Sequence, residues 1–323
     1  MPLSTRSFSR AFLSRPAPAE WALYGALAVL AAVGAWGPQV AADPHQHAFA
    51  DQRTLWGIAH AMDVLTNLPF ALMGLLGVRR LVQWVRSGKA GGCGEGVAQA
   101  AGTGRTTTAV MAAIFFSGLL LTAGASALYH AVPHNITLLW DRMGMLVAFT
   151  GLVGLAVDGR MGARPAWVLA CVLPLAGALS LRAWGMAGQV LPWGVLQGGG
   201  MLLVAALAMV PARSSRPPLS LVAVIGWYAL AKLLELGDHA VFGWTGGWVS
   251  GHSLKHVAAA LAAWPVIAAL APRRAPLPGA YWAQCMRAVS WRRPAAAVTG
   301  LRRGTIAASA DEGGQPGAAA RRV

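Results

Sequence analysis

Charged residues are scarce in this chain of 323 residues. They make up 11% of it, whereas hydrophobic residues make up 56%. A soluble domain carries about 25% charged residues. The mean hydropathy of +0.52 points the same way. This balance excludes an ordinary soluble domain and is typical of an integral membrane protein. The 39 glycines agree, because small residues let membrane helices approach one another closely.

Cysteine is also scarce. The three cysteines are scattered: Cys93 lies in a loop, Cys171 in an apolar segment and Cys285 in the C-terminal tail. No zinc-ribbon or redox spacing is present, and three scattered thiols do not make a disulfide framework. Any metal site must therefore use other side chains.

Acidic residues are few, with 11 Asp and Glu against 26 Lys and Arg, so the net charge is +15. Such a charge is also found in proteins that bind nucleic acid. Here, however, most basic residues lie in loops and tails between apolar runs, where cytoplasmic loops and anionic lipid headgroups explain them better. We therefore expect the membrane bilayer as a partner, and no nucleic acid.

The apolar runs predict an all-α, polytopic membrane helix bundle, with a seven-helix core and one additional N-terminal hydrophobic helix. Residues 1–42 form a basic N-terminus with the first hydrophobic segment, residues 43–272 the bundle, and residues 273–323 a basic cytoplasmic tail that we expect to be mostly disordered. The first segment is interpreted as a retained span, with a cleaved signal peptide as the alternative. The eight segments are 21–36, 58–82, 107–130, 137–157, 166–184, 194–211, 219–236 and 252–271.

The distribution of Lys and Arg predicts the orientation. With a cytoplasmic N-terminus, almost all basic residues lie inside, and little beyond Arg53, Arg182 and Lys255 lies outside. The ionisable residues within the spans then gather at the outer end of the bundle, where they usually mark a function. We expect few polar residues at the cytoplasmic end.

A metal site is predicted at that outer end. His252 and His256 lie four residues apart on the last span, so they share one helix face. With His130 from the third span they make a three-histidine zinc site with one position open for water. Asp141 would then act as general base and acid, and Ser126 would hydrogen-bond the water or a developing oxyanion.

Each of these residues also has a simpler interpretation. His130 can be a hydrated interfacial side chain, with His134 as a rival ligand that Pro133 places in a loop. Asp141 can form a helix-end ion pair with Arg142, and Ser126 can be a packing residue. His45, His47 and His60 are interpreted as surface residues, and His239 beside Asp238 as a supporting pair for the metal site.

The combined pattern resembles the alkaline ceramidase family, part of the CREST superfamily of seven-span membrane hydrolases that includes the adiponectin and progestin receptors. The resemblance is carried by Ser126-x-x-x-His130, then Asp141, then His252-x-x-x-His256, and it covers residues 50–272. The stretches Ser126–His130 and Gly251–His256 are similar to those of bacterial ceramidase-like proteins. A multi-pass protein of the inner (cytoplasmic) membrane is therefore expected, with its site at the outer face.

The resemblance implies zinc bound by His130, His252 and His256, with Asp141 and Ser126 completing the site. It implies hydrolysis of the amide of ceramide or a related N-acyl lipid to a fatty acid and an amine. Asp63 and Asn67 look like an acidic residue and an asparagine on the family's first core span. They make a candidate second site, one that resembles the family's calcium site. The acidic cluster that binds calcium in eukaryotic members is missing, which argues against Ca²⁺.

Two other functions remain open at this point. A receptor or sensor of the adiponectin-receptor type would keep the metal but hydrolyse little, and its basic tail would recruit a partner. A metal or small-solute transporter would use the histidine and aspartate cluster as a pathway. It would also need polar residues along the cytoplasmic half of the bundle.

Overall fold

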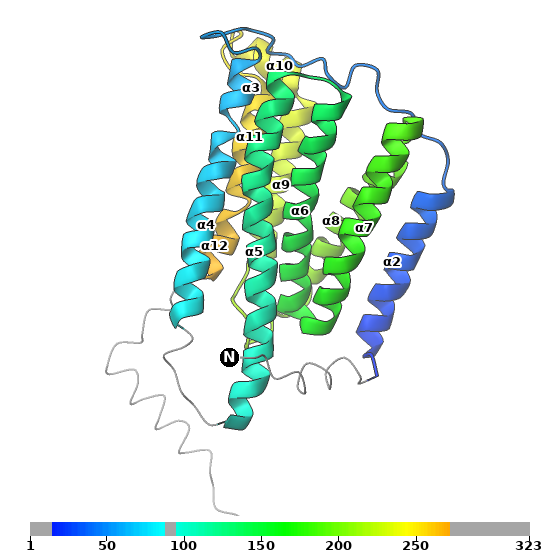
Figure 1. The fold of residues 1–323 in the computed structure, drawn as a ribbon, viewed down its shortest axis with the longest axis vertical. Coiled ribbons are helices and arrows are strands. Elements are labelled where there is room, and N and C mark those ends of the chain that lie inside the picture. The colour runs from blue at the N-terminus through cyan, green and yellow to red at the C-terminus, as the bar shows by residue number, and fades with distance from the viewer. Residues whose placement is uncertain (1–14, 88–94, 272–323) are drawn as a thin grey trace, which may run out of the picture. The chain divides into compact units, whose positions relative to one another are not determined.

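The protein is described here by a computed structural model that covers residues 15–87 and 95–271 (Figure 1). The predicted C-terminal tail, residues 273–323, lies outside the described residues. Apart from two isolated bridges, the described part is built from helices alone. They are α2 (Pro18–Trp36), α3 (Ala61–Leu65), α4 (Leu68–Ser87), α5 (Glu95–Ala131), α6 (Asn135–Arg160), α7 (Ala163–Ala187), α8 (Leu191–Ala208), α9 (Leu221–Leu236), α10 (Asp238–Trp244), α11 (Gly251–Leu261) and α12 (Trp264–Ala269).

The predicted class, an all-α polytopic membrane bundle, is confirmed. Within the described part, six helical segments are long and apolar enough to cross a membrane. The last two predicted spans are shorter than expected. α9 has 16 residues, and the final segment is divided into α11 and α12, with Pro265 in the first turn of α12. Proline is favoured there because its missing N–H group needs no partner in a first helical turn.

The centre of the bundle depends on close contact between α5 and α6, which lie side by side in Figure 1. Three glycines lie where any side chain would hold these two helices apart. A Cβ at Gly118 would lie 2.1 Å from Ala148 N, one at Gly151 would lie 2.2 Å from Phe115 N, and one at Gly144 would lie 2.8 Å from Thr122 N. This is the small-residue packing that membrane helices use in place of a hydrophobic driving force.

α2 packs at the edge of the bundle (Figure 1), where it contacts α8. Leu30 of α2 occupies the space beside Gly199 of α8, and an ion pair joins Glu20 to Arg164. The contacts explain how an additional N-terminal helix can be accommodated. Whether residues 1–42 are retained or cleaved stays a prediction.

One cluster of buried ionisable groups lies at the end of the bundle where few polar residues were expected. Asp158, near the last turn of α6, is buried and accepts hydrogen bonds from Thr108 Oγ1 at 2.5 Å and from Arg216 Nε at 2.9 Å. These residues line a small cavity with Leu219 and Val266. Asp158 and Asp141 stand near opposite ends of α6. Because Arg216 neutralises Asp158, we interpret this cluster as a structural tie between α5, α6 and the segment before α9.

The α5–α6 contact generates a stability prediction. We expect Gly151→Ala to lower the midpoint of thermal unfolding in detergent, since the new methyl group meets the backbone of α5. Overpacking of this kind costs about 1–3 kcal/mol. The matched control is Gly124→Ala on α5, where an added Cβ has no neighbour within 4 Å and an unchanged or higher midpoint is expected. Equal midpoints for the two variants would contradict this account of the packing.

Candidate metal centre

Three imidazole rings meet at the end of the bundle where α5 ends and α11 begins. His130 lies in the last turn of α5, and His252 and His256 face it from the first turns of α11. The ring centroids are 4.8 Å apart for His130 and His252, and 4.9 Å apart for each of the other two pairs. One nitrogen from each ring lies within 4.8 Å of the others. The three predicted ligands are therefore brought together.

One pair of ring nitrogens already has the separation that a tetrahedral metal ion requires. Zinc binds imidazole nitrogen at about 2.0–2.1 Å, so two ligands on a tetrahedron are separated by about 3.3–3.4 Å. The Nε2 atoms of His130 and His252 are 3.3 Å apart. His256 completes the set from the next turn of the same helix as His252. The group can hold a metal ion, and three nitrogen ligands leave a fourth position for water or substrate.

The start of α11 is fixed by its sequence. Ser250 caps the helix by accepting a hydrogen bond from Ser253 N at 3.0 Å. Gly251 permits close contact with the preceding helices, because a Cβ there would lie 2.2 Å from Leu234 O and 2.8 Å from Asp238 Cα. The helical spacing then places His252 and His256 on one face, as predicted.

The orientation of His256 is set by Thr66, in the short break between α3 and α4. Thr66 Oγ1 donates to Met62 O at 2.8 Å, which uses its one proton. His256 Nδ1 lies 3.1 Å from Thr66 Oγ1 and is therefore the donor in the bond between them. A proton on Nδ1 leaves the lone pair of Nε2 available for a metal ion.

Asp238, the first residue of α10, supports the site through two backbone groups. Its Oδ1 accepts from His252 N at 2.8 Å, and its Oδ2 accepts from Ala50 N at 3.0 Å. The carboxylate thus joins the first turn of α11 to the loop between α2 and α3. Of the predicted supporting pair, His239 and Asp238, Asp238 is buried beside the site whereas His239 is exposed.

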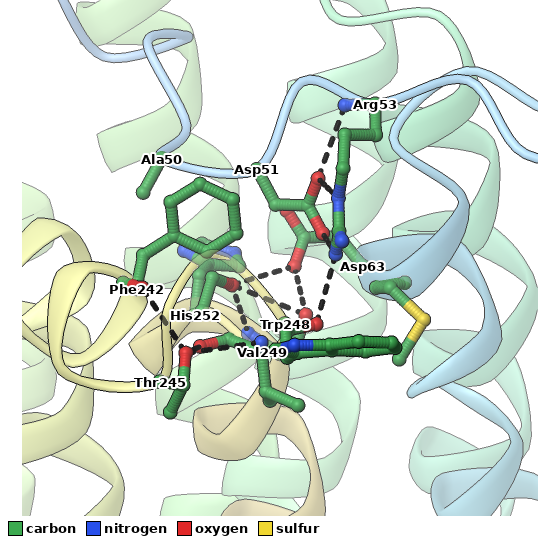
Figure 2. Close-up of polar contacts among 12 residues, drawn as sticks. Ala50, Asp51, Arg53, Asp63, Phe242, Thr245, Trp248, Val249 and His252 are labelled. Atoms are coloured by element: carbon green, nitrogen blue, oxygen red, sulfur yellow. Dashed lines mark hydrogen bonds and ion pairs between the residues drawn. The ribbon is translucent and has the colours of Figure 1, made fainter.

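The α2–α3 loop covers the rings. Phe49 is buried, with its ring centroid 4.6 Å from that of His130 and 4.9 Å from that of His252. Figure 2 shows how the loop is anchored: Arg53 binds both oxygens of Asp51, at 2.8 and 2.5 Å, and donates to Trp248 O at 2.9 Å. Burial raises the pKa of Asp51, but the hydrogen bonds and charge of Arg53 outweigh it and hold that pKa below its ordinary value.

Asp141 and Ser126 face each other across the α5–α6 contact. Ser126, one turn before His130, lies close enough to the Asp141 carboxylate to interact with it, and both side chains are buried. Among the described residues no ion pair joins Asp141 to Arg142. The Arg142 guanidinium lies over the Trp184 ring instead, 4.4 Å from its centroid. The helix-end ion pair is therefore not what the structure contains.

Lys255 is a neighbour of the centre that the sequence did not reveal. Its ammonium donates to His252 Nε2 at 2.8 Å and lies 3.4 Å from Glu235 Oε1. A metal ion would need the same nitrogen of His252, so binding requires Lys255 to release it. Glu235, which also pairs with Lys232, is the acceptor already within reach.

The other histidines are placed outside the triangle. His134 caps α6 by accepting hydrogen bonds from the backbone of that helix, which confirms its assignment to the turn after Pro133. His45 is exposed, as expected. His47 and His60 are not simple surface residues: His47 is bonded to Tyr129 Oη at 2.9 Å, and His60 packs its ring against Phe49.

Asp63 and Asn67 lie beside the centre but do not belong to the triangle. Asp63 is in α3, and Asn67 lies in the break before α4. Both are fully enclosed, with exposed fractions of 0% and 1%. Asp63 bonds Ser253 of α11 at 2.6 Å, so the two predicted sites share the first turn of that helix.

The geometry predicts one metal ion per chain. We expect equilibrium dialysis of detergent-purified protein against zinc, followed by elemental analysis, to give about one zinc per chain. The double variant His252→Ala/His256→Ala should bind none. His239→Ala, an exposed histidine, is the matched control and should bind zinc normally. Equal zinc in the double variant and the control would show that the triangle is not the site.

Asp238 generates a second prediction. In Asp238→Asn one of the two oxygen acceptors becomes an amide donor that faces a backbone N–H group, so the His252 turn or the covering loop is released. Changes to groups that orient metal ligands typically weaken binding by about 10–100-fold. A zinc titration with a competing chelator measures this change, and an unaltered dissociation constant would remove Asp238 from the support of the site.

Comparison with known proteins adds no assignment. No protein-family model matches the chain, and no curated protein sequence matches it. What is established is a membrane helix bundle with a three-histidine group that can hold a metal ion. The ceramidase-like reading rests on the resemblance of its site residues, and we take it up as a proposal.

Proposed function

We propose that this chain is a zinc-dependent membrane amidase that hydrolyses ceramide or a related N-acyl lipid to a fatty acid and an amine. The observation that carries the proposal is the convergence of a three-histidine group and a buried Ser126–Asp141 pair on adjacent helices of a membrane bundle. Three nitrogen ligands, an open coordination position and a nearby carboxylate are the components of a hydrolytic zinc site.

The choice of metal follows from the ligands. Imidazole suits zinc, and the 3.3 Å separation of the His130 and His252 nitrogens matches a tetrahedral ion. When bound, zinc supplies Lewis-acid activation of a water molecule and polarisation of a carbonyl group. The protein contributes the orientation: Thr66 fixes the His256 ring, and Asp238 fixes the turn that carries His252.

The proton transfers are assigned to Asp141. Its Oδ1 is buried and has no hydrogen-bond partner within the described residues, so it is available to accept a proton from the attacking water. The same carboxyl group can then deliver that proton to the leaving amine. Ser126, which interacts with Asp141, would hold the carboxylate in position, and once Asp141 has taken the proton of the water the Ser126 hydroxyl can turn and donate to the developing oxyanion.

A lipid substrate agrees with the surroundings of the site. Leu128, Ile136 and Trp140, on the helices that carry His130 and Asp141, expose large apolar side chains. Trp140 is half exposed, as expected for an aromatic side chain at a membrane interface. An acyl chain could therefore remain in the bilayer while its amide reaches the end of the bundle. Phe49 would limit water at the rings and must shift when an amide approaches.

The proposal is tested by hydrolysis and metal content together. Zinc-loaded protein in mixed micelles should release fatty acid from at least one member of a panel of ceramides and other N-acyl lipids. Asp141→Asn should keep its zinc but lose about 10²–10⁴-fold in rate, because a general acid–base group contributes about that much. Asp43→Asn, an exposed loop carboxylate, is the control and should retain the full rate.

Two results would count against the amidase. Full activity in Asp141→Asn would remove the assigned base. Zinc binding without hydrolysis of any amide in the panel would leave a metal-binding membrane protein of the receptor or sensor type.

A further inference from the structure

A second polar cluster lies next to the histidine triangle and is not used by the proposed reaction. It contains Asp63 and Asn67 around the α3–α4 break and Ser250 and Ser253 at the start of α11. All four side chains are buried, with exposed fractions of 0% or 1%. Asp63 Oδ1 accepts from Ser253 Oγ at 2.6 Å and from Ser250 Oγ at 3.3 Å. The two serine hydroxyls also contact each other at 3.1 Å.

Two oxygen atoms of this cluster have no hydrogen-bond partner within the described residues. They are Oδ2 of Asp63 and Oδ1 of Asn67. The amide nitrogen of Asn67 donates to Asp63 O at 2.8 Å. This bond identifies which amide atom is the nitrogen, so the atom without a partner is the oxygen. Buried acceptors are almost always satisfied, so two such atoms from side chains four residues apart require an explanation.

The charge of Asp63 is also uncompensated by an ion pair. None of the ion pairs found among the described residues includes it. Two other buried aspartates show the usual arrangement, since Asp51 is paired with Arg53 and Asp158 with Arg216. A carboxylate enclosed in a membrane bundle is stable only if something neutralises it.

We propose that Asp63 and Asn67 bind a monovalent cation, with sodium as the ion that their chemistry fits. Carboxylate and amide oxygens are hard ligands, which favour ions such as sodium over the softer metals that histidine binds. One carboxylate balances one positive charge. Ser250 and Ser253 offer further oxygen atoms, and the interrupted backbone at Thr66–Asn67 is the kind of helix break at which membrane proteins hold sodium.

A calcium ion fits this cluster less well. Calcium takes 6–8 oxygen ligands and is usually held by several carboxylates. Asp63 is the one carboxylate in the cluster, and Arg53 already occupies both oxygens of the neighbouring Asp51. The proposed site therefore differs from the calcium-like site suggested by the sequence in both charge and ligand number.

The test is thermal unfolding of the full-length protein in detergent. It is run with a chelator present, so that the histidine triangle and the proposed amidase activity do not enter the result. At equal ionic strength, NaCl in place of choline chloride should raise the unfolding midpoint by roughly 2–4 °C, because an ion that binds only the folded state stabilises it. The rise should be lost in Asp63→Asn and Asn67→Ala. It should persist in Asp158→Asn, the control with a buried carboxylate elsewhere in the bundle.

Direct binding covers the case in which Asp63→Asn fails to fold. Radioactive ²²Na⁺ should bind wild-type protein at one site per chain, and Asn67→Ala should weaken that binding by about tenfold or more, because sites of this kind are tuned by their ligands. Equal midpoints in sodium and choline, with no bound ²²Na⁺, would overturn the proposal and show that Asp63 carries a proton. In a further arm with CaCl₂ in excess over the chelator, stabilisation by CaCl₂ but not by NaCl would overturn the monovalent assignment.

Discussion

Three imidazole rings packed within 4.9 Å of one another are the constraint on which the rest of the histidine end depends. Rings this close must be largely uncharged, since charged rings would repel one another in a medium of low dielectric constant. The surrounding residues hold the rings in this arrangement. Thr66 accepts a hydrogen bond from His256 Nδ1, and Asp238 accepts one from the His252 backbone. Phe49 packs its ring against that of His130.

The sequence predicted the parts of the site that depend on local spacing. His252 and His256 are four residues apart on a helix, and Pro133 separates His130 from His134, so these assignments needed no tertiary information. Thr66, Phe49 and Lys255 were not predicted as neighbours of the site, because each meets the histidines only through the packing of distant segments. No periodicity or motif marks a phenylalanine in a polar loop as the cover of a metal centre.

The same distinction explains the errors in the fold. Apolar composition located the helical segments, but it does not report backbone breaks within them. Pro265 was a visible signal for the division of α11 and α12. The break between α3 and α4 carries the same signal, because Pro69 lies in the first turn of α4, and there the side chains of Thr66 and Asn67 also bond the preceding turn. Asp158 was overlooked because a single acidic residue barely changes the hydropathy of a long apolar helix.

Charge compensation divides the buried aspartates into two groups. Five aspartates are buried in the described part of the chain, and two of them, Asp51 and Asp158, are neutralised by arginines. The other three, Asp63, Asp141 and Asp238, have no basic partner within ion-pair distance there, and all three adjoin the helices that carry the histidines. Backbone N–H groups satisfy Asp238.

For Asp63 and Asp141 no comparable set of donors is present, since each keeps one buried oxygen without a partner. Uncompensated carboxylates beside three neutral imidazoles lower the electrostatic cost of placing cations at this end of the bundle. The ammonium group of Lys255 is one cation at this end, and it donates a hydrogen bond to His252. Because Ser253 bonds Asp63 and lies between the two α11 histidines in sequence, an ion at either place would order the same turn. Binding at one site should therefore change the affinity of the other, and by the same factor in both directions, as thermodynamic linkage requires.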